Sequence, residues 1–575
     1  MINNFLYFFN KNQKKTLFLL FCFMLISTIL EMAGLGFIFS IVGILNPANI
    51  ESNVFVNKII TFLNLDSSEI IYYFILIFLI FYTIKVIFLI FYNWFESSFL
   101  YSYKEYLSSS VFRKYLDQNF SYFYNRNSSE LIRNLMTEVD HFAGYLVSLL
   151  KLLLEIIVVI GIFCVLAYVN FYFTVVISLV FLTISSLYFF LIKEKLNLWG
   201  LQRQSNIQKR IQFMQEGFDG IKIIKLLGRE KFFFNKFKTH NVNLSQASMK
   251  AHFFQGMPRL LFEFVGIFLI TFSLFFLYGS GKNLVEITQV LSVYVAASFR
   301  ILPSVNRIVT SLQYMKLSYP SLNVLYLELK NFKKEERQDY DKFIFNKNIA
   351  IDIKKFKYPN SKNFEISDIK LNIAKGQKIG IIGPSGSGKS TVVEILTGIS
   401  DQPTGSITVD DKSIFSNIRG WQKLIGFVPQ KIFILDESLR NNILFGLDNN
   451  KYDDNQILSM IKKLSLENLL NRLPRGLDEN LGEEGINLSG GEIQRIGLCR
   501  ALIYNPEILF LDEATSSLDV NTETQILDEL KIFKEKTIIS IAHRINTLKN
   551  CDKIYRFDSG RIIEEGGFDK FKGQH

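Results

Sequence analysis

Residues 383–391, GPSGSGKST, lie between the apolar stretch KIGII and the amphipathic stretch VVEIL. This order predicts a strand, a glycine-rich loop and a helix, and the loop has the pattern G-x-x-x-x-G-K-S. Backbone N–H groups of such a loop wrap phosphate oxygens, and the helix N-terminus adds its positive dipole end. Lys389 would neutralise the β- and γ-phosphate oxygens, and the Ser390 hydroxyl would bind Mg²⁺. The predicted nucleotide contacts here are Gly383, Pro384, Ser385, Gly386, Ser387, Gly388, Lys389, Ser390 and Thr391.

A second segment, PEILFLDEATSSLD (506–519), supplies carboxylates. Its four apolar residues before Asp512 predict a buried strand that would deliver Asp512 to the metal and Glu513 beside it. A carboxylate in the position of Glu513 can polarise an attacking water, which is the role that phosphoryl transfer leaves to the protein. The two segments together predict Mg²⁺-dependent hydrolysis of ATP.

The part of the chain before residue 316 has a different character. Its apolar runs reach the roughly 20 residues that a membrane-spanning helix needs. They cover residues 16–45, 70–100, 144–168, 171–192, 253–279 and 287–315. We therefore expect an α-helical six-span transmembrane domain (1–315), a charged linker (316–345) and an α/β P-loop nucleotide-binding domain (346–575).

The distribution of charge gives the topology. Residues 193–250 contain twelve Lys and Arg against four Asp and Glu, whereas residues 46–69 contain one Lys against three acids. Positive loops stay in the cytoplasm, so 101–143, 193–250 and everything after 316 are predicted to be cytoplasmic. Both longer inner loops are expected to continue the spans as helices. Residues 53–63 in the outer loop carry an apolar helical face, which fits either a short surface helix or the entry into the second span.

Two broad functions are disfavoured by composition. The formal charge of +11 lies largely beside the apolar spans, and no basic cluster interleaved with aromatic residues suggests nucleic-acid binding. The four cysteines (Cys22, Cys164, Cys499 and Cys551) lack C-x-x-C spacing and are expected to be small buried apolar side chains, not disulfides or metal ligands.

The segment LSGGEIQR (488–495) upstream of the carboxylate strand resembles the signature of ATP-binding-cassette proteins. Six spans followed by one such cassette resemble a half-size exporter of that superfamily. This resemblance implies a homodimer in which each ATP lies between one P-loop and the partner's signature, because one chain has a single copy of each. It also implies that LGEEG (481–485) contacts the membrane domain.

Further site residues follow from the same resemblance. Tyr358 matches the aromatic residue that stacks on adenine, and Gln430 matches the glutamine that senses Mg²⁺ and the transport domain. Asp519 matches the interface aspartate, and His543 matches the switch histidine near the γ-phosphate. The implied catalytic residues are Glu513 and His543. Those implied for the metal are Ser390, Gln430 and Asp512, and those from the signature are Ser489, Gly490, Gly491 and Glu492.

Four cationic residues in or near the spans bear on the cargo. Arg300 and Arg307 are two helical turns apart in the last span, about 20 and 30 Å inward from its outer end. Lys85 reaches about the depth of Arg300, and Arg259 falls near the inner boundary. Charges at such depth usually face a cavity or a partner. The four together, unbalanced by acids at the same depth, predict a cavity for an anionic group, although Arg259 could pair with Glu263 and Arg307 could reach the interface instead.

The abundant Phe and Leu around these cations suit an acyl or prenyl tail, so an anionic lipid meets both conditions. The membrane half is also similar to the bacterial lipid-linked oligosaccharide flippase of protein N-glycosylation. That resemblance implies an undecaprenyl-pyrophosphate glycan as cargo and the bacterial inner membrane as location. A multidrug or lipid A-type exporter, and a channel-like member that uses ATP for gating, remain as alternatives.

Overall fold

The computed structural model describes residues 8–44, 70–124, 126–169, 171–279, 284–330, 343–358, 364–448, 451–513, 525–526, 528–533, 535–542 and 544–572. The chain divides into two compact units. One contains residues 1–118 and 126–334, and the other contains residues 119–125 and 335–575. The short segment 119–125 therefore belongs to the second unit, although it lies in the chain between helices of the first.

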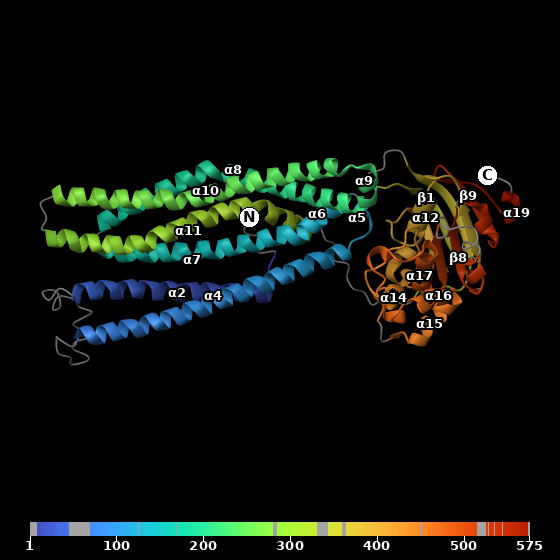
Figure 1. The fold of residues 1–575 in the computed structure, drawn as a ribbon, viewed down its shortest axis with the longest axis horizontal. Helices are drawn as coiled ribbons and strands as arrows, with labels where there is room; N and C mark the ends of the chain where they lie inside the picture. The colour runs from blue at the N-terminus through green and yellow to red at the C-terminus, as the bar shows by residue number, and fades with distance from the viewer. Residues whose placement is uncertain are drawn as a thin grey trace. The chain divides into compact units, whose positions relative to one another are not determined.

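The first unit is helical. Figure 1 shows its long helices running side by side, with α2 next to α4 and with α7, α8, α10 and α11 forming a bundle. The long helices are α2 (Lys11–Ile44), α4 (Ile70–Leu116), α7 (Val139–Val169), α8 (Phe171–Asp219), α10 (Glu230–Gly279) and α11 (Leu284–Lys330). Shorter elements are α6 (Ser128–Arg133), the π-helix η2 (Asn134–Glu138) and α9 (Ile221–Leu227).

Five helices among the described residues are long and apolar enough to cross a membrane, and they lie in α2, α4, the α6–α7 region, α8 and α10. Large apolar side chains such as Ile87 and Ile90 are more than 60% exposed on α4, as expected for helix surfaces that face lipid. The sixth predicted span lies in α11, whose side chains are described only from residue 301.

The predicted helical extensions of the inner loops are confirmed, because α4 continues to Leu116 and α8 to Asp219. Two other predictions fail or remain open. Residues 316–330 were expected in a linker but form the end of α11, which continues through Pro303 and Pro320. The outer segment 53–63 lies outside the described residues.

The second unit is an α/β domain with two sheets. An antiparallel sheet has the strand order β2-β1-β4-β5, and a mostly parallel sheet has the order β10-β9-β3-β8-β7-β6. The strands are β1 (Asn348–Phe356), β2 (Ile366–Ala374), β3 (Lys378–Ile382), β4 (Thr404–Val409), β5 (Lys412–Ser413), β6 (Ile425–Val428), β7 (Ile508–Asp512), β8 (Thr537–Ile541), β9 (Lys553–Asp558) and β10 (Arg561–Gly566).

The helices of this unit cover the sheets. They are α5 (Ser121–Tyr124), α12 (Lys389–Leu396), α13 (Ile418–Gln422), α14 (Leu439–Leu444), α15 (Asp454–Lys463), α16 (Glu467–Arg472), α17 (Gly490–Leu502) and α19 (Phe568–Phe571), with 3₁₀ turns η3 (Ile414–Ser416), η5 (Gly476–Asp478), η6 (Glu483–Gly485) and η7 (Ile545–Leu548). Strands β3, β8 and β7 are almost wholly apolar, as expected for parallel strands that are covered on both faces.

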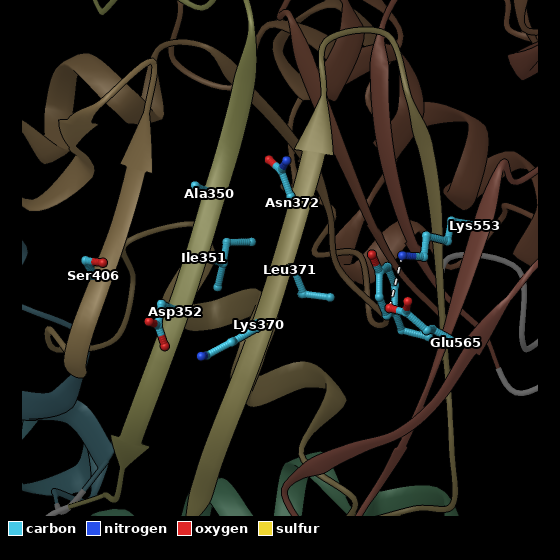
Figure 2. Close-up of a pocket in the computed structure, with 10 residues that line it drawn as sticks. Ala350, Ile351, Asp352, Lys370, Leu371, Asn372, Ser406, Lys553 and Glu565 are labelled. Atoms are coloured by element: carbon cyan, nitrogen blue, oxygen red, sulfur yellow. Dashed lines mark ion pairs between the residues drawn. The ribbon is translucent and has the colours of Figure 1, made fainter.

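Between the two sheets of this unit lies a shallow pocket of about 300 Å³ (Figure 2). Its lining comes from β1, β2, β4, β9 and β10, and Lys553 and Glu565 form an ion pair of 3.0 Å at one side. None of the predicted nucleotide-binding residues lines this pocket, so it is separate from the site described below.

The cysteines are free thiols. Cys499 is fully buried, as predicted, while Cys22 and Cys551 are partly buried and Cys164 is exposed on α7. The expectation that all four are buried therefore holds in full only for Cys499 and is wrong for Cys164. Because α7 is one of the apolar helices, exposure in the single chain places Cys164 on a surface that faces lipid or another helix.

Candidate nucleotide-binding site

The glycine-rich loop joins β3 to α12, as the sequence predicts. Its backbone conformation favours glycine, as Gly383 and Gly388 illustrate. Gly388, the N-cap of α12, has φ of 101°, and a Cβ at Gly383 would lie 2.2 Å from the carbonyl oxygen of Phe557. The carboxyl ends of β3 and β7 lie on the same edge of the parallel sheet, with β8 between them. This edge is where ligands bind in open α/β sheets.

The Lys389 side chain is curled into the loop. Its ammonium donates hydrogen bonds to the carbonyl oxygens of Gly383 (2.9 Å) and Pro384 (3.0 Å). Burial lowers the pKa of Lys389, while the nearby carboxylates of Glu513 and Asp512 raise it. The charged ammonium is thus held inside the loop and close to the acids, where it can meet the phosphate groups of a nucleotide.

Ser390 and Asp512 come together as two of the three residues predicted for the metal. The Ser390 hydroxyl donates to Asp512 Oδ1 over 3.4 Å. Burial, and then the charge of Glu513, raises the pKa of the Asp512 carboxyl. A bound divalent cation would offset both effects. A hydroxyl and a carboxylate at this separation fit Mg²⁺, which prefers oxygen ligands and completes its shell with phosphate oxygens and water. When bound, Mg²⁺ would neutralise charge on the transferred phosphoryl group.

Glu513 stands directly after the strand and is 8% exposed. Its backbone has a φ of 49°, a region that residues with side chains adopt rarely and often at functional sites. Gln430 Nε2 donates to Glu513 Oε2 at 2.6 Å. The structure therefore brings Gln430, Glu513, Asp512 and Ser390 into one cluster, which suits a carboxylate that orients water beside a metal-bound phosphate.

Tyr358 lies just beyond β1 in the same unit. Its ring packs edge-on against Phe356, with centroids 5.1 Å apart, and its hydroxyl donates to Glu394 Oε2 at 2.6 Å. Burial, and then the hydrogen bond to Glu394, raises the pKa of Tyr358. The carboxylate of Glu394 was not anticipated from the sequence, where it is one more polar residue on the amphipathic helix.

The signature residues form the N-terminus of α17. Ser489 is the N-cap, and its hydroxyl accepts from the backbone N–H of Glu492, whose carboxylate accepts from the Ser489 N–H at 2.7 Å. This reciprocal capping box leaves the N–H groups of Gly490 and Gly491 at the positive helix end. In the described part of the chain, no hydrogen bond joins residues 489–492 to the P-loop. Asp519 and His543 lie outside the described residues.

The cationic residues of the helical unit do not form the uncompensated group that the sequence suggested. Arg307 Nε lies 2.5 Å from Glu155 Oε1, and the Glu155 side chain is 5% exposed. The prediction that no acid balances these charges at their depth is therefore wrong for Arg307. Glu155 could have been noticed, because an acid inside an apolar helix normally has a partner.

The other three cations differ from one another. Lys85 is half-buried and lies 4.9 Å from the centroid of the Tyr82 ring, and it stands close to Gly34 of α2. Arg259 is exposed on α10, and among the described residues it forms no ion pair with Glu263, which is also exposed. The side chain of Arg300 lies outside the described part of the chain. The convergence of the four cations therefore stays a prediction.

Comparison with known proteins agrees with both units. Residues 17–302 match the family described as ABC transporter transmembrane region, and residues 366–516 match ABC transporter. A solved structure of a bacterial Atm1-family ABC exporter with ATP bound has the same fold, with a TM-score of 0.80 at 19% identity over 99% of this chain and 97% of that one.

Curated relatives extend this result. YknU, an uncharacterized ABC transporter ATP-binding protein of Bacillus subtilis, is 28% identical over 80% of this chain and 79% of its own length. YwjA from the same organism is 31% identical over 61% of this chain and 62% of its own length. A putative export ATP-binding/permease protein of Rickettsia bellii is 39% identical, but the match spans 37% of each protein.

The fold and the site define a membrane protein with a cytoplasmic ATPase domain that couples ATP hydrolysis to transport. The chain belongs to the ABC transporters, as a half-size exporter with one transmembrane and one nucleotide-binding domain.

Proposed function

We propose that this exporter works as a homodimer and flips an amphiphile with an anionic head, namely a polyprenyl-pyrophosphate-linked oligosaccharide, from the inner to the outer leaflet of a bacterial inner membrane, for protein glycosylation. The dimer is supported by the single P-loop and single signature of each chain. Because residues 489–492 share no hydrogen bond with the P-loop among the described residues, a second chain would complete each ATP site.

A large apolar cavity in the helical unit is the observation that supports an amphiphilic cargo. It has a volume of about 740 Å³ and lies between α7, α8 and α11. Representative lining residues are Phe163, Ile177, Phe181, Phe189, Leu302 and Val309. A cavity of this size lies within the range of ligand sites, and its lining favours hydrocarbon.

The length of this cavity suits a chain-like occupant. Its lining on α8 runs from Thr174 to Lys193, and these residues are about 28 Å apart along a helix at 1.5 Å per residue. The length is also close to the hydrocarbon thickness of a bilayer, about 30 Å.

A positive charge stands at one end of the cavity. Lys193 is part of the lining, and its ammonium lies 4.0 Å from the centroid of the Phe190 ring. An anionic head placed there could form a charge-assisted contact while the tail follows the apolar wall. Lys85, Arg259 and Arg300 remain proposed contacts of the pyrophosphate. Arg307 could join them only by sharing its charge with Glu155.

In the proposed cycle, ATP binding draws two nucleotide-binding domains together and turns the cavity outward. Glu513 then polarises the water that attacks the γ-phosphate, and hydrolysis resets the transporter. In this scheme Lys389 would bind phosphate oxygens, Ser390 and Asp512 would hold Mg²⁺, and Gln430, which donates to Glu513, would position that carboxylate. His543 and Asp519 are assigned by resemblance alone.

The test is reconstitution of the purified protein in liposomes that contain candidate pyrophosphate-linked lipids, with ATP-dependent exposure of the glycan as the measured quantity. We expect exposure with the parent chain and none with Glu513→Gln, which should still bind nucleotide. Steady hydrolysis by Glu513→Gln would remove the proposed role of that carboxylate.

A multidrug or lipid A-type exporter is the second candidate, and the Arg307–Glu155 pair favours it because a balanced pair does not call for an anionic head. Stimulation of ATP hydrolysis by apolar cations, without stimulation by pyrophosphate lipids, would decide for this candidate. Passive ion conductance without lipid movement would indicate a channel that ATP gates.

A further inference from the structure

A single carboxylate in the nucleotide-binding domain gathers hydroxyl groups from three separate parts of the chain. Glu394 accepts hydrogen bonds from Tyr124 (2.9 and 3.1 Å), from Tyr358 (2.6 Å) and from Ser400 (3.2 Å). Ionised carboxylates accept several hydrogen bonds at once, and such charge-assisted bonds are among the stronger ones in proteins.

The residues Glu394, Tyr358 and Tyr124 lie on elements that have different roles. Glu394 lies on α12, the helix whose first residues are Lys389 and Ser390, so its position is tied to the phosphate-binding loop. Tyr358 follows β1 and is the residue expected to stack on the base. Tyr124 is the last residue of α5, in the segment 119–125 that belongs to this unit but follows the apolar helix α4 in the chain.

The rings of the two tyrosines are also in contact. Their centroids are 4.9 Å apart with an angle of 46° between the planes, and Phe120 packs edge-on against Tyr124 at 5.1 Å. The segment is further held by the Ser121 hydroxyl, which donates to Asp401 Oδ1 at 3.2 Å. Burial, and then hydrogen bonding within the cluster, raises the pKa of Tyr124 and that of Tyr358, so both hydroxyls stay protonated donors.

We propose that Tyr124 is a positioning residue for the base of the nucleotide: through Glu394 it fixes the ring of Tyr358, and it thereby couples occupancy of the base position to the segment that follows α4. This proposal rests on the nucleotide site described above, with Tyr358 as the stacking residue. Among the described residues, none of the predicted metal ligands forms a hydrogen bond with this cluster, although Tyr358 has a side-chain hydrogen bond with Thr391 of the glycine-rich loop and the charge of Glu394 acts on Asp512. Removal of the Tyr124 hydroxyl alters neither of these two interactions, so its effect should fall on the base.

The physical reason for coupling is that the two tyrosines share one acceptor and one ring contact. Any shift of Tyr358 on stacking with adenine changes both its hydrogen bond to Glu394 and its contact with Tyr124. Coupling between two sites is reciprocal, so displacement of residues 119–125 must change the affinity for adenine nucleotides by the same factor. The hydroxyl of Tyr124 is the part of this connection that can be removed with the least disturbance.

Binding of ATP and of inorganic tripolyphosphate to the full chain in detergent provides the test, because tripolyphosphate has phosphates but no base. Tyr124→Phe keeps the ring and removes the hydroxyl. We expect it to weaken ATP binding by about 3- to 10-fold, which is the size of the net contribution of one ordinary hydrogen bond, and to leave tripolyphosphate binding unchanged. Ser121→Ala is the matched control, because it removes the neighbouring contact to Asp401 and leaves Glu394 untouched; it should change neither affinity.

A double substitution separates this mechanism from a general loss of packing. If Tyr124 acts through Tyr358, then in a Tyr358→Ala background the change Tyr124→Phe should have no further effect on ATP binding. Equal weakening of ATP and tripolyphosphate, no weakening of ATP, or full additivity with Tyr358→Ala would each overturn the proposal. If Tyr358 does not stack on the base, then Tyr358→Ala alone would leave ATP binding unchanged. This result distinguishes failure of the proposed nucleotide site from failure of the proposed role of Tyr124.

Hydrogen exchange gives a second readout in the reverse direction. In the Glu513→Gln variant, ATP should alter the exchange of a peptide that covers residues 119–125, whereas tripolyphosphate should not. Adding Tyr124→Phe should abolish the response to ATP. An identical response to both ligands would show that the segment senses phosphates, and the proposal would be wrong.

Discussion

The ion pair between Arg307 and Glu155 allows the structural and the cargo-binding roles of a membrane cation to be separated. The Glu155 side chain is 5% exposed, while that of Arg307 is 40% exposed. Removal of one partner from a buried pair typically costs about 3–5 kcal/mol because the other charge is left without compensation. The partial exposure of Arg307 places this pair at the low end of that range.

The two single substitutions should therefore differ. Arg307→Gln leaves the more buried charge alone, and we expect a loss of about 3 kcal/mol, or a thermal midpoint roughly 5–10 °C lower in detergent. Glu155→Gln leaves the more exposed charge, which can reach polar surroundings, so the loss should be about 1 kcal/mol. The double change to Gln at both positions should regain most of the loss, since two amides can hydrogen-bond to each other without a net charge.

Flipping in liposomes then gives the role of Arg307. If the pair is structural, the double variant should recover ATP-dependent glycan exposure together with stability. If Arg307 also binds an anionic head, the double variant should be stable but slow to flip. The reasoning about burial would be refuted by an Arg307→Gln midpoint within a degree of the parent, or by a double variant no more stable than Arg307→Gln.

Three further outcomes are expected. A Cβ at Gly200 of α8 would lie 2.3 Å from the carbonyl oxygen of Leu317, so Gly200→Ala should lower the stability of the helical unit by about 1–3 kcal/mol in thermal unfolding. A Cβ at Gly217 of the same helix would meet no atom within 4 Å, so Gly217→Ala should stabilise the unit slightly. Burial raises the pKa of Cys551 to about 12, so little of its thiolate is present at pH 8. Iodoacetamide should therefore modify Cys551 far more slowly than in the unfolded chain, at a rate that rises about tenfold per pH unit. Rapid modification of Cys551 in the native protein would contradict its burial. Ser489→Ala removes the N-cap of α17 and should lower the stability by about 1 kcal/mol in thermal unfolding, whereas Ser489→Thr should lower it much less. Equal losses for the two variants would exclude a capping role.

The nucleotide site could be predicted from the sequence because its determinants are local. The loop before Lys389 and the strand before Asp512 each place their functional residue by an element that can be read from a few neighbouring letters. The meeting of Ser390 with Asp512 then follows from the common edge of parallel strands. The resemblance assigned Gln430 to the site as a residue that senses Mg²⁺ and the transport domain, but its hydrogen bond to Glu513, 83 positions away, was not predicted.

Other features depend on contacts that no local pattern contains. Glu394 has the spacing of an ordinary polar residue on an amphipathic helix, and its importance comes from Tyr124, 270 residues earlier in the chain. The end of the last long helix was misjudged for a related reason. Residues 316–330 are polar enough to resemble a linker, but Leu322, Leu325 and Leu329 are buried against the rest of the helical unit, which stabilises the helix as far as Lys330.

Prediction of the cargo also depends on contacts between helices that are distant in the sequence. The sequence supplies the depth of a residue along a helix, and depth placed Arg307 among four cations that were predicted to bind an anion. The packing of α11 against α7 instead pairs Arg307 with Glu155. The charge that lines the apolar cavity is then Lys193, a residue whose position near the end of a span looks like a simple interface anchor. A head bound there would leave its tail to run along the whole cavity toward Thr174. The proposal of an amphiphile with one long chain therefore rests on the wall of the cavity and not on Arg307. The proposal of a pyrophosphate head depends on whether Lys85, Arg259 and Arg300 meet at the same end.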